Sequence, residues 1–172
     1  EAVVGRMNSD LANNLGNLAQ RSLSMVSKNC GAAVPQPGEF TDEDRAILAA
    51  AGELLEISRR AYDVQDFHGA LEATWKVLGD TNAYFAEQAP WVLRKTDVER
   101  MNTVLYVTLE VLRIVAILIQ PVMPDSAAKL LGVLGQDDDA ARQFSAIGTP
   151  LVPGTALPAP TPIFPKYEEP AE

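Results

Sequence analysis

Three polar side chains that could read a nucleic-acid base recur along the first amphipathic segment of the chain. Asn13, Asn17 and Arg21 are spaced by four residues, so a helix places them on one face, roughly opposite a stripe of leucines. An Asn amide offers donors and an acceptor, and Arg adds a planar fork that can hydrogen-bond or stack. A solvated helix face without a partner is the plainer interpretation of the same spacing, because exposed Asn and Arg are common.

A tryptophan beside a proline forms the second group of interest. Trp91 follows Pro90 directly, and Arg94 and Lys95 come within the next four residues. Because Pro90 interrupts the preceding helix, we expect Trp91 on a loop or first turn, where its ring face can meet solvent. Single-stranded bases stack on such rings, at about 1–3 kcal/mol per base, while cations hold the backbone. Partial burial of Trp91 in the core is an equally simple alternative.

Two further polar residues lie shortly before this group. Asn82 and Tyr84 precede Trp91 by less than three helical turns, so we expect them at the same end of the fold. The alternative for Tyr84 is core packing, and we expect Phe85 beside it to be a core residue.

No pattern typical of a catalytic or metal site is present. Cys30 is the one cysteine and His68 the one histidine, which excludes a disulfide framework and a zinc site of Cys and His ligands. The chain has no Gly-rich phosphate loop and no nucleophile motif. Its acidic runs, 42–44 and 137–139, stand at predicted helix starts, where carboxylates favour the helix dipole. We expect no catalytic residue, metal ion or cofactor in this segment.

The charge of the chain is strongly acidic but uneven. Its 172 residues carry a net charge of −9, and residues 36–66 and 136–172 together hold fourteen acidic and five basic side chains. This balance argues against indiscriminate binding of DNA or of a membrane surface. It does not exclude a small base-reading site in the near-neutral segments around Arg21 and Trp91.

The spacing of apolar residues predicts an all-α bundle of about five to six helices and no strand. The expected helices cover approximately 8–28, 41–61, 66–88, 96–120, 124–134 and 138–144. Thr41 with Asp44, and Thr96 with Glu99, form capping-box patterns, and Pro90 should force Ala89 into an extended conformation.

The long apolar segment 104–123 is expected to be the core helix. Glu110, Arg113 and Gln120 interrupt it, which argues against a membrane span of about twenty apolar residues. Glu110 and Arg113 are three residues apart, so their side chains can pair.

The last part of the chain differs in amino-acid composition. Seven of the twelve prolines lie between Pro150 and Pro170, so regular helix is excluded there. We therefore divide the chain into a bundle, 1–146, and an extended arm, 147–172. Apolar residues such as Phe164 and Tyr167 suggest that the arm packs on the bundle or on regions outside this chain. Because the first residue is Glu1 rather than Met, we expect a segment of a longer parent protein.

Four stretches, in this order, resemble the C-terminal anticodon-binding domain of bacterial methionyl-tRNA synthetases, a family of class I aminoacyl-tRNA synthetases. They are N-S-D-L-A-N-N-L-G-N-L-A-Q-R at 8–21, A-E-Q-A-P-W at 86–91, L-I-Q-P-V-M-P at 118–124 and P-I-F-P at 162–165. The N-L-A-Q-R and E-Q-A-P-W pieces are the most specific.

The resemblance implies an anticodon-binding helix bundle that reads the CAU anticodon of methionine tRNAs. By this resemblance Asn17 and Arg21 contact the anticodon bases, Trp91 stacks on them, and Pro90 sets the ring. Position alone adds weaker candidates for tRNA contact, namely Asn13, Asn14, Asn82, Tyr84, Arg94 and Lys95.

The family resemblance also implies a cytoplasmic parent enzyme that ligates methionine to tRNA with ATP and Mg²⁺, through a catalytic domain in the same chain. The HIGH and KMSKS signatures of that domain are absent from this sequence, so the segment itself is not expected to be catalytic. The lack of an appended dimerisation domain resembles the monomeric form of the family. Two alternatives stay open: the equivalent domain of a cysteinyl or leucyl enzyme, and a helical protein-interaction module.

Overall fold

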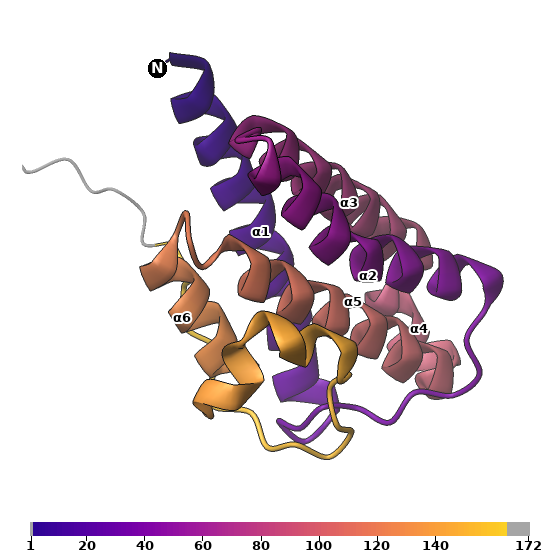
Figure 1. The fold of residues 1–172 in the computed structure, drawn as a ribbon. Helices are drawn as coiled ribbons and strands as arrows, with labels where there is room; N and C mark the ends of the chain where they lie inside the picture. Colours follow the sequence, from indigo (N-terminus) through magenta and orange to yellow (C-terminus); the bar gives the residue numbers. More distant parts are fainter. Residues whose placement is uncertain (1, 165–172) are drawn as a thin grey trace, which may run out of the picture.

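The computed structural model of the chain describes residues 2–164 and has, within them, six α-helices, two short 3₁₀-helices and no strand (Figure 1). The helices are α1 (Ala2–Asn29), α2 (Asp42–Asp63), α3 (Phe67–Gln88), α4 (Pro90–Thr96), α5 (Val98–Ile119), α6 (Pro124–Val133), η1 (Asp139–Arg142) and η2 (Phe144–Gly148). The predicted all-α bundle is confirmed.

Helix α5 forms the centre of the bundle. Every residue from 103 to 119 is buried, and α1, α2, α3, α4 and α6 all pack against this helix. Its length and composition would suit a membrane crossing, but 94% of its most apolar window is buried inside the fold. The prediction of a core helix is therefore confirmed. In Figure 1, α2 and α3 run side by side as a helical hairpin across this core.

A buried ion pair on α5 fastens the start of the arm. Arg113 Nη2 lies 2.7 Å from Glu110 Oε1, as the spacing predicted, and both side chains are almost fully buried. The Arg113 guanidinium also donates to the carbonyls of Ala146 and Ile147, each at 2.9 Å. Glu110 Oε2 accepts the backbone N–H of Leu151 at 3.0 Å. These bonds satisfy both charges and tie the chain after η2 to the core helix.

The described part of the arm packs back on the bundle. The N–H of Val34 donates to the Thr155 carbonyl at 2.9 Å, so the arm pairs with the segment that follows α1. Ile163 is buried, and Phe164 packs against the core, where its ring lies close to Gly16 of α1. Tyr167, also expected in the arm's apolar contact, lies outside the described residues.

Two local predictions are wrong. Ala89 is not extended but left-handed, with φ of 47°. It ends α3 in the left-handed conformation that is common at helix C-termini, and its N–H donates to the Phe85 carbonyl. Thr96 does not cap the core helix, because α4 continues through it. Asp97 is the cap instead, and its carboxylate accepts the N–H of Arg100 at 3.0 Å.

Other predictions about helix ends hold. The capping box of Thr41 and Asp44 is present in full, and Asp66 caps α3 through the N–H of Gly69. The short helix expected near 138–144 is replaced by the two 3₁₀-helices η1 and η2.

Candidate nucleic-acid interface

Arg21 and Trp91, which are distant in the sequence, meet in space. The guanidinium carbon of Arg21 lies 5.3 Å from the centre of the Trp91 ring and 5.1 Å from that of Phe85. The two rings are tilted by 54° with their centres 5.9 Å apart. A cation at this distance from a ring face is attracted by the ring quadrupole. The contact therefore joins α1, the end of α3 and the start of α4 at one place on the surface.

The backbone between α3 and α4 aims Trp91 at this place. Ala89 ends α3 in the left-handed conformation, and Pro90 starts α4 as its first residue, where a missing N–H is harmless. Pro90 is buried, whereas Trp91 is 39% exposed. Trp91 thus stands on a first turn, as predicted. It is partly exposed and partly buried, which also agrees with the alternative of partial burial in the core.

Helix α1 supplies the polar side of the interface. Asn13, Asn17 and Arg21 are all exposed, and Asn14 is half-buried. Among the described residues, no hydrogen bond or salt bridge is made by the side chains of Asn17 and Arg21. The polar groups of these two exposed side chains are therefore available to a ligand.

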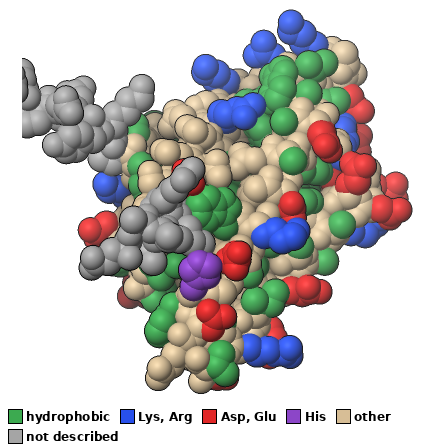
Figure 2. All heavy atoms as spheres, turned by 90° about the horizontal axis from the view of Figure 1, so that it is seen from above, with side chains coloured by type: hydrophobic (Ala, Val, Ile, Leu, Met, Phe, Trp, Pro, Cys, Tyr) green, Lys and Arg blue, Asp and Glu red, His purple; other side chains and the backbone are tan. Residues whose placement is uncertain are grey.

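Helix α4 adds two cations. Arg94 and Lys95 are exposed in its last turn, one turn beyond Trp91. Figure 2 shows one face of the molecule, on which several Lys and Arg side chains lie along the upper edge beside hydrophobic ones and others are scattered over the rest of the face. Such a mixture of apolar and basic groups suits a ligand that has both ring faces and phosphates.

A hydrogen-bonded network holds the turn before Trp91. Gln88 is the last residue of α3, and its amide donates to Glu43 at 2.9 Å and accepts from Arg100 at 2.8 Å. Arg100 in turn makes a two-pronged contact with the buried carboxylate of Asp44, at 2.6 and 3.0 Å. The starts of α2 and α5 and the end of α3 are thereby fixed to one another.

Asp44 is the centre of this network. Burial acts to raise the pKa of the Asp44 carboxyl, but hydrogen bonds from Arg100, Tyr84 and the Thr41 N–H outweigh it and hold the pKa below its ordinary value. The hydrogen bond that Arg100 donates to the Asp44 carboxylate raises the pKa of Arg100 in turn. The network is therefore charged at neutral pH.

Tyr84 does not belong to the interface, which corrects one of the weaker candidates. Its side chain is 5% exposed, and its hydroxyl donates to Asp44 Oδ1 at 2.5 Å. Burial, with the adjoining carboxylate, raises the pKa of Tyr84 well above its ordinary value, so the hydroxyl stays a donor. Asn82 is half-buried, and its amide donates to the Leu78 carbonyl of its own helix at 3.2 Å.

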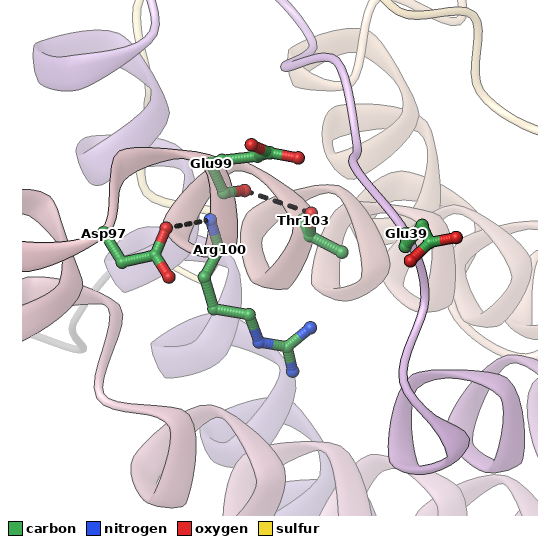
Figure 3. A pocket seen from close by; sticks show the side chains of 5 residues that line it. All are labelled: Glu39, Asp97, Glu99, Arg100 and Thr103. Atoms are coloured by element: carbon green, nitrogen blue, oxygen red, sulfur yellow. Dashed lines mark hydrogen bonds between the residues drawn. The ribbon is translucent and has the colours of Figure 1, made fainter.

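A hollow near the start of α5 has the wrong charge for a nucleic acid. Glu39, Asp97, Glu99, Arg100 and Thr103 line it (Figure 3). The Arg100 guanidinium is engaged by Asp44 and Gln88, so three carboxylates dominate the lining. Among the described residues, no group of three His, Cys, Asp or Glu side chains is arranged to hold a metal ion.

Sequence reasoning missed the contact between Phe85 and Arg21, and the role of Arg100 in the network that holds the turn before Trp91. Phe85 is 1% exposed and was assigned to the core, which is where it lies. One edge of that core nevertheless touches Arg21. Its position in the sequence was the only available signal. Phe85 lies six residues before Trp91, on the other side of a helix break, so both rings can face the same side chain.

Comparison with known proteins gives a consistent result. A family model described as the anticodon binding domain of methionyl tRNA ligase matches residues 34–172. The curated methionine–tRNA ligase of Mycobacterium tuberculosis is 59% identical over 174 residues, covering 99% of this chain and 33% of the relative. That of Brucella melitensis is 56% identical over 169 residues, with 98% and 33% covered.

Solved structures agree with these relatives. The free-state crystal structure of the Mycobacterium tuberculosis methionyl-tRNA synthetase superposes with a TM-score of 0.92 at 59% identity, covering 99% of this chain and 35% of the other. Its complex with methionyl-adenylate gives 0.91, with 96% and 33% covered. The chain thus spans about a third of the length of the curated relatives it matches. These matches favour the methionyl type over the cysteinyl and leucyl types that the sequence alone left open.

Proposed function

Because the chain belongs to the methionine–tRNA ligase family and matches its anticodon-binding domain, we propose that it binds the anticodon loop of methionine tRNAs and reads the CAU sequence. The observation that carries this proposal is the contact of Arg21 with Trp91. It unites a hydrogen-bonding fork and a partly exposed stacking surface, which are the two elements that single-stranded base recognition needs.

Each side chain has a separate role in this mechanism. The exposed part of the Trp91 ring stacks on an anticodon base that has left the loop's own stack. Asn17, one helical turn before Arg21, bonds a base edge, and Arg21 adds its N–H groups. Arg94 and Lys95 neutralise phosphates of the loop, while Asn13 and Asn14 extend the polar surface along α1.

The acidic balance of the chain supports selectivity in this arrangement. With few cations at the interface, the affinity for an arbitrary polyanion is small. Discrimination therefore depends on stacking and on hydrogen bonds to base edges, which differ between bases.

The parent protein would ligate methionine to the bound tRNA. We propose that its remaining two thirds form the catalytic domain, in the same chain, and use ATP and Mg²⁺ there. We further propose that the parent works as a monomer in the cytoplasm.

Filter binding of the full-length parent tests the proposal. The ligands are an anticodon stem-loop with CAU and the same stem-loop with its first anticodon base changed. We expect tighter binding of CAU, and a loss of that preference in Arg21→Ala and Trp91→Ala. Equal binding of the two stem-loops by the wild type would contradict the proposed reading of the CAU sequence.

A further inference from the structure

We propose that Phe85 is a positioning residue for anticodon recognition, which it serves by holding Arg21 without touching the tRNA. This inference rests on the function proposed above and adds a residue to it. Phe85 is 1% exposed, so the ring itself is out of reach of a ligand.

The geometry of three groups carries the inference. The Arg21 guanidinium carbon, the Phe85 ring and the Trp91 ring form a triangle with sides of 5.1, 5.3 and 5.9 Å. The guanidinium carbon therefore lies at nearly equal distance from both rings, which are tilted by 54° to each other. Arg21 has no other described partner for its charge. The two rings are therefore what fixes this long and otherwise mobile side chain.

This placement determines how Arg21 can act. The guanidinium carbon lies within cation–π distance of both rings, while no N–H group of Arg21 donates to a described residue, so these N–H groups are left for a ligand. A guanidinium that is already held in place before binding loses less conformational entropy on binding than a mobile one. Arg21 is accordingly expected to hydrogen-bond the tRNA through its N–H groups, and Trp91 provides the stacking surface.

A purely structural role makes a different prediction for the same residue. If Phe85 only filled the core, its loss would lower stability and would affect tRNA selection to the same degree whether or not Arg21 is present. If Phe85 acts through Arg21, its loss weakens selection only when Arg21 is there to be positioned. A double-mutant cycle separates the two roles.

The experiment measures kcat/KM for methionine tRNA with the full-length parent carrying Phe85→Leu, Arg21→Ala and both changes. Circular dichroism identifies a temperature at which all variants are folded. We expect Phe85→Leu to lower kcat/KM about two- to five-fold, the factor that matches one cation–π contact. The loss should come through KM for tRNA, and Phe85→Leu should have no further effect in the Arg21→Ala background.

Two matched variants complete the design. Phe85→Met keeps most of the side-chain volume but removes the ring, and it should reproduce the loss. Leu130→Ala removes a fully buried side chain from α6, which lies in the core away from the interface, and should show no coupling to Arg21→Ala.

The possible failures are distinguishable. An equal loss from Phe85→Leu in both backgrounds, or no loss in either, overturns the positioning role and leaves the proposed function standing. If Arg21→Ala alone leaves tRNA selection intact, the role of Arg21 in the proposed function is wrong and the role of Phe85 falls with it.

Discussion

Replacement of Trp91 by alanine should separate tRNA recognition from chemistry in the parent enzyme. The change removes the stacking surface, which costs about 1–3 kcal/mol for one base, or about 5- to 150-fold in kcat/KM. It also removes one of the two rings beside Arg21, so the loss should fall in the upper half of that range.

The structure also sets the stability cost of this change. With 39% of Trp91 exposed, about 150 Å² of the side chain is buried, which is worth at most about 4 kcal/mol. The assay must therefore run well below the melting temperature of the variant.

Aminoacylation of methionine tRNA is the measurement, with ATP–pyrophosphate exchange as the control. The exchange reaction reports methionyl-adenylate formation, which needs no tRNA, and it should stay near the wild-type rate. Trp91→Phe keeps a ring and should recover part of the loss. The reasoning is refuted if Trp91→Ala aminoacylates as well as the wild type, or if both reactions fall in parallel.

Three further predictions concern the scaffold. Arg113→Ala should lower the free energy of unfolding by about 3–5 kcal/mol in urea titrations, because it leaves the buried Glu110 without its partner; replacing both residues by Met and Leu should cost less. The pKa of Asp44 is lowered in the fold. The stability that its ionised carboxylate contributes is therefore present above the ordinary carboxyl pKa near 4 and is lost as the pH falls through the folded value. The melting temperature of Asp44→Asn should change less than that of the wild type between pH 5 and pH 3. Ala89→Gly should raise the free energy of unfolding by about 0.5–1 kcal/mol, since it relieves the strain of a left-handed alanine. Thermal denaturation measures this change, and a melting temperature below that of the wild type would contradict it.

Local signals in the sequence were sufficient to predict most of the fold. The apolar residues around Glu110 and Arg113 predicted a buried core helix, which α5 is. Thr41 with Asp44 predicted a capped helix start, which the structure has at α2. The failures lie where two local rules compete. Thr96 and Asp97 are both good caps, and the length of α4 decided between them. At Ala89, the proline rule favours an extended residue, but the left-handed end of α3 prevails.

The candidate site was predictable only in part. Residue type and spacing singled out Arg21 and Trp91, but they are separated by most of three helices, and no local rule says that their side chains touch. Tyr84 shows the reverse error, because its partner Asp44 lies forty residues earlier in the chain. Phe85 was assigned correctly to the core, yet its contact with Arg21 depends on the angle at which α1 crosses the end of α3.

Photo-crosslinking tests the central claim most directly. A methionine tRNA carrying 4-thiouridine at the third anticodon position is irradiated with the full-length parent, and the crosslinked peptides are identified by mass spectrometry. The proposed mechanism predicts crosslinks within 13–21 of α1 or 85–95 around α4. Crosslinks confined to other parts of the chain, with these two segments unmodified, would contradict it.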